Sequence, residues 1–406
     1  MEQRILKIKN YYRAINQRIR FIVSIFIFCS CGSEDDGVAN ASLTRGVEFE
    51  YLDSVVVETL MELFIADKDE NSERLLFNEM QMKEFFVTDM KGKIISQIKL
   101  KGEGPNEIPS PSEIAFYKDG LLVKESSAEI KFNFYDKNFI KTGQSQTLAQ
   151  GIYFMGFLNS AQSFSVVEKE KKNMIIGYEY NMLNDQLKTR EDELGVDFYE
   201  KAEMGYLYLV DTEELFPLNL YPESWQPRVE QKWMGFSLPF LQLTKSDQVV
   251  AVLPRFGNQM FYYNLNDTTI TPLTEINLIH PERNVDESFD FKQDDKMLYP
   301  FFSRLMGGGE YFLVEFHTAF PREIYETFQA KNKDFKMDPE FWEAIEKHHK
   351  ANYILTDSKG NQAPIAELPI SGVINYLDAD DVLYIKPITE TELDYNVFYR
   401  YKVSLK

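Results

Sequence analysis

The sequence predicts an all-β fold, a six-bladed β-propeller of four-stranded antiparallel blades with short helical insertions on one face. Short apolar runs bounded by turn residues recur along the chain, as expected of strands. The order strand, Asp-containing turn, strand repeats, and six of the runs align as equivalent strands, which is typical of a propeller. A two-sheet sandwich is the main alternative, but it would not explain this repeated order.

The clearest copy of the repeated unit predicts the second blade, with strands at Glu113–Tyr117, Leu121–Glu125, Ile130–Tyr135 and from Phe139 onward. Short turns that contain Asp separate the first strand from the second and the third from the fourth. The second strands of the six blades are expected at Leu75–Asn78, Leu121–Glu125, Phe164–Val167, Val249–Leu253, Tyr311–Phe316 and Val382–Ile385.

The two ends of the propeller sequence predict how the ring closes. The sixth blade lacks a fourth strand before the chain stops at Lys406, whereas the β-branched run Ser54–Thr59 precedes the first blade unassigned. A closed ring leaves no open sheet edge. We therefore expect Ser54–Thr59 to pair with Val397–Val403 as the outer strand of the sixth blade.

Four long insertions are expected on one face of the propeller. In an antiparallel blade, the connection between strands two and three emerges on the same side as the connection between blades. The insertions of this kind are residues 172–205, 221–237, 279–296 and 317–352. Residues 338–350 begin with an N-cap Asp and a Pro and are predicted to be helical, as are residues 184–204. Because functional residues often lie on loops held by a rigid scaffold, this face is the predicted working face.

The N-terminus has the features of a secretory signal. A basic stretch is followed by the apolar run Phe21–Phe28, which is too short to span a bilayer, and then by Ser30 and Cys31. A small residue before a Cys resembles a lipoprotein signal, so Cys31 is the predicted lipidation site; a plain secretory signal is the alternative. The predicted parts of the chain are a lipoprotein signal peptide (1–30), an acidic flexible tether (31–46) and a single propeller (47–406).

Charge and cysteine content exclude several functions. The net charge is −20, and such a surface repels nucleic acids and anionic lipids, so no nucleic-acid partner is expected and the lipid anchor is the only predicted membrane contact. The two cysteines, Cys29 and Cys31, both lie beside the apolar run. The propeller therefore has no disulfide, thiolate nucleophile or Cys-based zinc site.

One crisp local motif lies between the first two blades, where Gly102, Gly104, Pro105 and Glu107 form a G-x-G-P-x-E loop. A structural role is predicted for it, because glycines permit positive φ and proline fixes the next turn. With the signal and the repeat order, the loop resembles uncharacterised six-bladed propeller lipoproteins of Bacteroidota. The acidic run Gly32–Asp36 resembles the tag that sends such lipoproteins to the outer face of the outer membrane, although a plain acidic linker is the alternative.

Candidate ligand contacts lie in the insertions. Trp225, Arg228 and Trp233 crowd residues 221–237, and aromatic rings beside an Arg can stack a sugar or hold a peptide, although they can equally cover the core. The other candidates are His280 and His317.

No catalytic residue, metal site or cofactor is predicted. The sequence has no nucleophile elbow, HExxH motif or P-loop, and adjacent histidines on a helix do not share a metal. The leading hypothesis is a non-catalytic outer-membrane lipoprotein that binds a glycan, a peptide or an envelope protein through the long-insertion face. A glycan lyase or hydrolase is the alternative, which carboxylates or histidines converging on the central channel would favour.

Overall fold

The structure is a computed structural model that describes residues 42–43, 46–69, 71–150, 162–169, 172–183, 187, 195–244, 249–284, 289–389 and 393–406. The predictions for the signal peptide, including lipidation of Cys31, lie outside the described residues. Within the described ranges, no helix is long and apolar enough to cross a bilayer.

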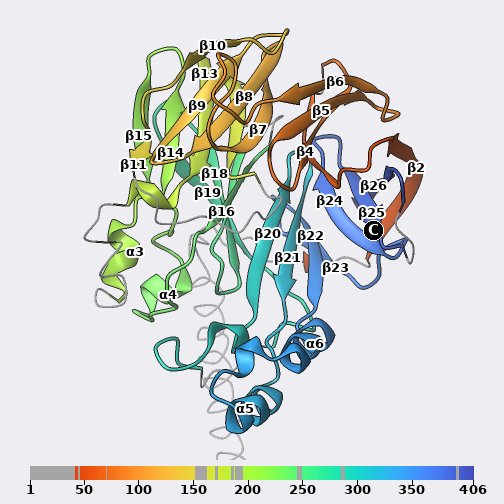
Figure 1. The fold of residues 1–406 in the computed structure, drawn as a ribbon. Coiled ribbons are helices and arrows are strands. Elements are labelled where there is room, and N and C mark those ends of the chain that lie inside the picture. The colour runs from red at the N-terminus through yellow and green to blue at the C-terminus, as the bar shows by residue number, and fades with distance from the viewer. Residues whose placement is uncertain are drawn as a thin grey trace, which may run out of the picture. The chain divides into compact units, whose positions relative to one another are not determined.

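In the described part of the chain, six antiparallel sheets follow one another as the blades of a propeller, which confirms the predicted fold (Figure 1). The first blade holds β3 (Leu63–Asp69), β4 (Arg74–Glu79), β5 (Glu84–Asp89) and β6 (Ile94–Lys99). The second holds β7 (Pro111–Tyr117), β8 (Gly120–Ser126), β9 (Glu129–Tyr135) and β10 (Lys141–Gln144), with β11 (Ala149–Gln150) added on β9. The third holds β12 (Phe164–Lys169), β13 (Lys172–Tyr178), β14 (Gly205–Leu209) and β15 (Glu214–Leu218).

The remaining blades follow the same order. The fourth holds β16 (Phe240–Leu243), β17 (Val249–Leu253), β18 (Gln259–Leu265) and β19 (Ile270–Asn277). The fifth holds β20 (Phe301–Gly307), β21 (Tyr311–His317), β22 (Ala351–Asp357) and β23 (Asn361–Ile365). The sixth holds β24 (Gly372–Leu377), β25 (Val382–Pro387), β26 (Asn396–Leu405) and the N-terminal strand β2 (Val47–Val57).

The predicted ring closure is confirmed. Strand β2 pairs antiparallel with β26, and its register places Ser54 opposite Tyr399. The pairing begins earlier than predicted, at Val47. Part of the predicted tether is also structured, because Ser42 and Leu43 form β1, which pairs in parallel with β23.

One predicted strand assignment is wrong. Phe164–Val167 is part of β12, the first strand of the third blade, and the second strand is β13, which was predicted to begin an insertion. Both strands are short and apolar, and the two pair along their whole length. Strand order within a blade depends on this pairing, which the residue pattern of a single run does not contain.

The repeated Asp turn has a common hydrogen-bond pattern. In the first blade, Asp89 Oδ1 accepts hydrogen bonds from the backbone N–H groups of Lys91 and Lys93 at 2.9 and 3.0 Å. Gly92, three residues after the Asp, has a φ of 89°, a conformation that glycine adopts without strain. The same acceptor pattern recurs at Asp136, Asp357 and Asp378. The repeat in the sequence is therefore the signature of a carboxylate that stabilises a tight turn.

The insertions lie on one side of the propeller, as predicted. They contain η1 (Tyr180–Met182), α3 (Asp197–Lys201), α4 (Gln226–Val229), η2 (Lys296–Leu298), α5 (Arg322–Lys331), η3 (Phe335–Met337) and α6 (Pro339–His348). Figure 1 shows α3 to α6 gathered below the blades, and we call this side the long-insertion face. We call the opposite side, where strands one and two and strands three and four connect, the tight-turn face.

The two helix predictions have different outcomes. Helix α6 is confirmed, and the Asp338 side chain caps it by accepting from the Glu340 N–H at 3.0 Å. Of the second predicted helix, residues 184–204, the structure describes α3 and a helical residue at Leu187, and Phe198 and Tyr199 of α3 are buried. These aromatic rings serve the core, which a mixed-charge sequence pattern did not indicate.

The core fills the spaces between neighbouring blades. Separate clusters of buried side chains join the sixth blade to the first and the fifth to the sixth, for example. The cluster between the third and fourth blades extends into the insertions and includes Trp225, Phe291 and Phe341. Burying one such side chain contributes roughly 1.5–3 kcal/mol. The insertions are thus part of the core rather than loose loops.

Candidate functional site

The candidate site is a cavity of about 310 Å³ at the tight-turn end of the central channel. The first strands of all six blades, β3, β7, β12, β16, β20 and β24, contribute to its wall. Turn residues such as Asn71, Lys118 and Gly308 form its rim, which identifies the face on which it opens. A concave site where polar groups from many elements converge is the usual form of a ligand pocket.

The wall is held together by side chains that bond to the backbone of a neighbouring blade. A first strand has one unpaired edge, and its backbone groups require partners when they are buried. Polar side chains supply such partners around the channel. The contacts are Asn375 Oδ1 with Ile65 N (2.7 Å), Asp67 Oδ2 with Phe116 N (2.8 Å), Gln162 Nε2 with Ile114 O (3.2 Å) and Gln242 Nε2 with Leu305 O (3.3 Å).

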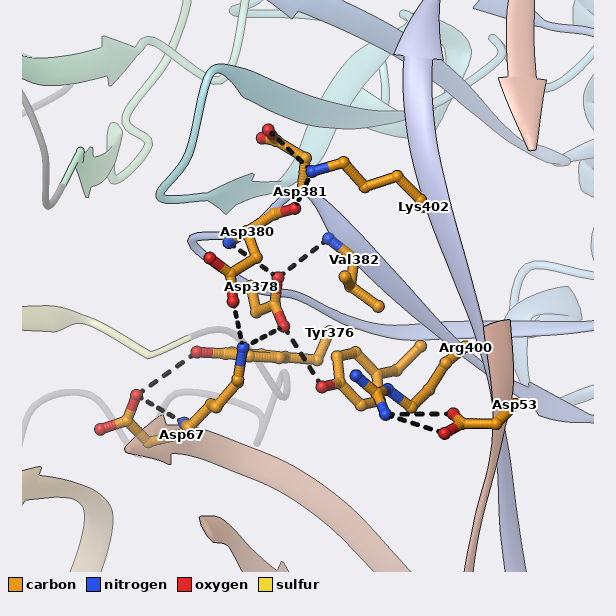
Figure 2. A network of polar contacts seen from close by, with 11 residues as sticks. Asp53, Asp67, Tyr376, Asp378, Asp380, Asp381, Val382, Arg400 and Lys402 are labelled. Atoms are coloured by element: carbon orange, nitrogen blue, oxygen red, sulfur yellow. Dashed lines mark hydrogen bonds and ion pairs between the residues drawn. The ribbon is translucent and has the colours of Figure 1, made fainter. Parts of the chain in front are cut away.

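A buried ionic network lies beside the cavity, at the seam between the sixth and first blades (Figure 2). Lys68, whose side chain is 5% exposed, places Nζ 2.9 Å from Asp378 and 2.6 Å from Asp380. The Tyr384 hydroxyl donates to Asp378 at 3.2 Å, and burial raises the pKa of Tyr384 above its usual range. The charge of Lys68 is therefore balanced within the protein.

The carboxylates at the mouth are also engaged. Asp67 accepts hydrogen bonds from the Phe116 N–H and, at 3.3 Å, from the Tyr376 hydroxyl. Burial acts to raise the pKa of Asp69, but hydrogen bonds from Ser72 and from Arg74 outweigh it and hold that pKa below its usual value. Asp69 therefore stays ionised, and the hydrogen bonds of both side chains serve the architecture of the mouth.

None of the predicted contact residues lines this cavity. Trp225 is 1% exposed and stacks on Tyr221 at 5.3 Å between ring centres, so the interpretation that it covers the core is the correct one. Trp233 is half-buried and stacks on Tyr199, while Arg228 donates to the Tyr221 carbonyl. Ligand contact at Arg228 and Trp233 stays a prediction.

The two histidine candidates have different neighbours. His280 packs against Phe316 and lines an apolar groove of about 710 Å³ beside Leu43, and burial lowers its pKa. His317 lies 4.8 Å from His349, ring centre to ring centre, and burial lowers the pKa of His349 to about 4. Among the residues that the structure describes, no group of three metal-binding side chains forms.

The G-x-G-P-x-E loop has contacts that support a structural role, for a reason different from the one predicted. Neither Gly102 nor Gly104 has a positive φ. Instead, Glu107 folds back and accepts from the Gly104 N–H at 2.9 Å, and a Cβ on Gly102 would overlap the Glu107 carboxylate. The glycines provide space for this carboxylate.

Sequence reasoning missed the residues of the cavity, although one signal was present. Gly307, Gly308 and Gly309 form the single triple-glycine run in the sequence, and two of them line the cavity. A Cβ on Gly309 would overlap Asp381. A glycine run at a tight turn between the first two strands of a blade can indicate such close packing.

The fold and the cavity define a class, a six-bladed β-propeller with a pocket of polar and apolar side chains at one end of its channel. A member of the DUF4221 family from Bacteroides vulgatus has a similar structure, with a TM-score of 0.58 and 12% identity over 89% of this chain and 100% of that one. A candidate exported protein from Bacteroides fragilis matches with a TM-score of 0.51 and 11% identity over 91% of this chain and 99% of that one.

At these identities the similarity shows the fold alone, and in the fold it confirms the predicted resemblance to propellers of Bacteroidota. No protein-family model and no curated protein matches the sequence.

Proposed function

We propose that this chain is a lipid-anchored cell-envelope protein that binds a small polar ligand at the tight-turn mouth of its channel, without catalysing a reaction. The observation that carries the proposal is the cavity where the first strands of all six blades meet. The side chains of its wall are held by hydrogen bonds between blades, so the pocket is preorganised.

The state of the mouth carboxylates supports binding over the glycan lyase or hydrolase alternative. A general acid needs a raised pKa, whereas that of Asp69 is lowered. Both oxygens of Asp67 already accept hydrogen bonds from the protein. Asp69 therefore lacks the raised pKa of a general acid, and Asp67 is held in place by the protein.

The N-terminal sequence supports envelope location, as does the exported neighbour from Bacteroides fragilis. Lipidation at Cys31 is tested by mass spectrometry of the protein isolated from the envelope. We expect an acylated N-terminal Cys31, and Cys31→Ala should lose incorporation of a palmitate analogue. Continued labelling of that variant would contradict the anchor.

Binding is tested on the intact lipoprotein in detergent by thermal-shift screening against sugars, amino acids, nucleosides and short peptides. Ser165 lines the cavity, and Ser165→Trp should fill it and abolish the shift produced by any true ligand. Ser358, in an outer turn of the same face, provides the matched control Ser358→Trp. Hits that survive Ser165→Trp would contradict a site at the mouth.

Contact with a protein partner through the long-insertion face is a second candidate function. Its support is the end of the α5–α6 insertion, where Met337 is 83% and Trp342 is 56% exposed. Large exposed apolar side chains that lie close together often mark interaction surfaces. Crosslinking in whole cells from a photoreactive residue at position 342 tests this candidate, with position 359 on the tight-turn face as the control.

A further inference from the structure

We infer that the ligand of the channel-mouth cavity is an uncharged, hydroxyl-rich molecule of the size of a mono- or disaccharide. This inference rests on the proposed binding function and adds the chemical class of the ligand. It follows from which polar groups at the mouth are already used by the protein and which are left over.

The charged groups of the wall are balanced internally. Lys68 pairs with Asp378 and Asp380, and Asp69 lies 2.7 Å from Arg74. The exposed rim adds one cation, Lys118, whose Nζ lies over the Tyr117 ring, and one anion, Glu168. Asp67, the remaining carboxylate of the wall, accepts hydrogen bonds from the protein at both oxygens. The charges that are left lie on the exposed rim, one of each sign, so the interior of the cavity favours neither an anion nor a cation, and burying an unpaired charge is costly.

The wall side chains left over are uncharged and fixed in orientation. The Ile65 N–H binds the amide oxygen of Asn375, which leaves Asn375 Nδ2 as a donor. The carbonyls of Ile114 and Leu305 bind the amide nitrogens of Gln162 and Gln242 instead, which leaves their Oε1 atoms as acceptors. In each case the backbone partner decides which end of the amide is free.

Asn375 is the strongest indication of a ligand. It lines the cavity and is only 5% exposed, and its Nδ2 has no hydrogen-bond partner among the residues that the structure describes. A polar group that faces a cavity is hydrogen-bonded by water or by a ligand, so the Asn375 Nδ2 donor is available to a ligand in this cavity.

A free donor and two free acceptors together favour a ligand that carries hydroxyl groups. A carboxylate would satisfy the Asn375 donor but would repel the two Gln oxygens, and an ammonium group would do the reverse. A hydroxyl donates and accepts, so a molecule with several hydroxyls satisfies all three, and the Ser165 hydroxyl at the same wall can do either. The partly exposed rings of Phe116 and Tyr376 add flat surfaces on which the C–H face of a sugar ring can stack.

The cavity size limits the ligand. About 310 Å³ lies at the lower end of the range for small-molecule pockets. One or two sugar rings match this space, and a longer glycan could enter only by its end.

The test measures binding by saturation-transfer NMR and calorimetry on the intact lipoprotein in detergent. The probes are neutral mono- and disaccharides, each matched with its uronic acid and its amino sugar. We expect at least one neutral member to bind, and its charged counterparts to bind about tenfold more weakly, since each leaves a buried group unpaired.

Two variants test whether side chains of the cavity wall bind the ligand. Asn375→Asp keeps the acceptor for the Ile65 N–H but replaces the free donor with an acceptor. This variant should lower the affinity for the neutral ligand about tenfold or more. If Asn375→Asp lowers the melting temperature, Ser165→Ala provides the second readout, with Ser358→Ala as the matched control.

The outcomes separate the two proposals. Preferred binding of a uronic acid or an amino sugar that Ser165→Trp abolishes would overturn the ligand class and leave the binding function standing. Absence of binding by every neutral sugar would also overturn the ligand class. Binding of any sugar that resists Ser165→Trp would overturn the site itself.

Discussion

The tight-turn and long-insertion faces differ in what their connections do. On the tight-turn face, short turns leave the end of the channel open, and six first strands surround a cavity lined by polar and apolar side chains. On the long-insertion face, the insertions contribute aromatic side chains such as Trp225 and Phe341 to one continuous core cluster. Long insertions in this propeller therefore extend the core, and ligand binding on their face stays a prediction.

The two faces also differ in the partners of their buried cations. Lys68 on the tight-turn face has two carboxylate partners, whereas Arg283 on the long-insertion face is 8% exposed, and its Nε and Nη1 have no hydrogen-bond partner among the residues that the structure describes. The Arg283 guanidinium donates to the Gly257 carbonyl through Nη2 and lies 4.2 Å from the centre of the Phe302 ring, and burial lowers its pKa to about 10. The long insertions also contain ion pairs, Arg322–Asp294 and Lys336–Asp295, but their acidic partners are less buried than Asp378. We therefore expect the largest electrostatic effect on stability at Lys68 and the largest packing effect in the long insertions.

Trp225→Ala should have the largest effect on stability. Removing a fully buried indole from the long-insertion face should lower the free energy of unfolding by about 3–5 kcal/mol, because a cavity is left behind. Denaturant unfolding measures this loss, and Trp342→Ala, at an exposed indole, is the control. A melting temperature equal to that of the parent would show that Trp225 is not part of the core.

Lys68→Met should have a similar effect for an electrostatic reason. The variant leaves Asp378, whose side chain is 0% exposed, without its cation, and loss of one partner of a buried pair costs about 3–5 kcal/mol. The control is Lys402→Met, where a side chain that is 44% exposed lies 3.8 Å from Asp381, and about 0–1 kcal/mol is expected. If both variants lost the same free energy of unfolding, the buried ion pair of Lys68 would contribute no more to stability than the exposed one of Lys402.

Acidification should lower the free energy of unfolding by a smaller amount, through protonation of His349 in the long insertions. Burial holds the pKa of His349 at about 4, below its ordinary value of 6.5, so the folded protein prefers the neutral ring. The resulting stabilisation of the folded state is complete above pH 6.5 and is lost as the pH falls towards 4. Because His349 is partly exposed, this stabilisation is roughly 1 kcal/mol.

Unfolding at pH 7 and pH 5 measures that effect, and His349→Gln should reduce the difference between the two values. His348→Gln, one residue away, is the matched control. If the two variants respond to pH alike, the His317–His349 contact does not cause the dependence.

Ser165→Trp should have the smallest effect on stability and a large effect on binding. Ser165 is half-buried at the open mouth, where the new ring can occupy the cavity, so a change within about 0.5 kcal/mol is expected. Thermal melting with and without ligand separates the two effects. A large loss of stability would mean that the mouth is packed more tightly than the cavity indicates.

The sequence was informative about features that depend on neighbours along the chain. Asp turns, apolar runs and the N-cap at Asp338 predicted the blades and α6, because turn chemistry and strand periodicity are local. Strand order within a blade then placed the insertions on one face, and the spare run Ser54–Thr59 matched the strand missing from the sixth blade.

The tertiary structure alone decided which face holds the cavity and which side chains line it. The Asn375–Ile65 contact joins residues 310 positions apart, and only closure of the ring brings them within hydrogen-bond distance. Packing within the fifth blade brings His317 beside His349 across an insertion. The burial of Trp225 depends on Tyr199 from the preceding insertion as well as on Tyr221 from its own. Residue types do not specify these positions, because burial and hydrogen bonding are set by partners that packing supplies.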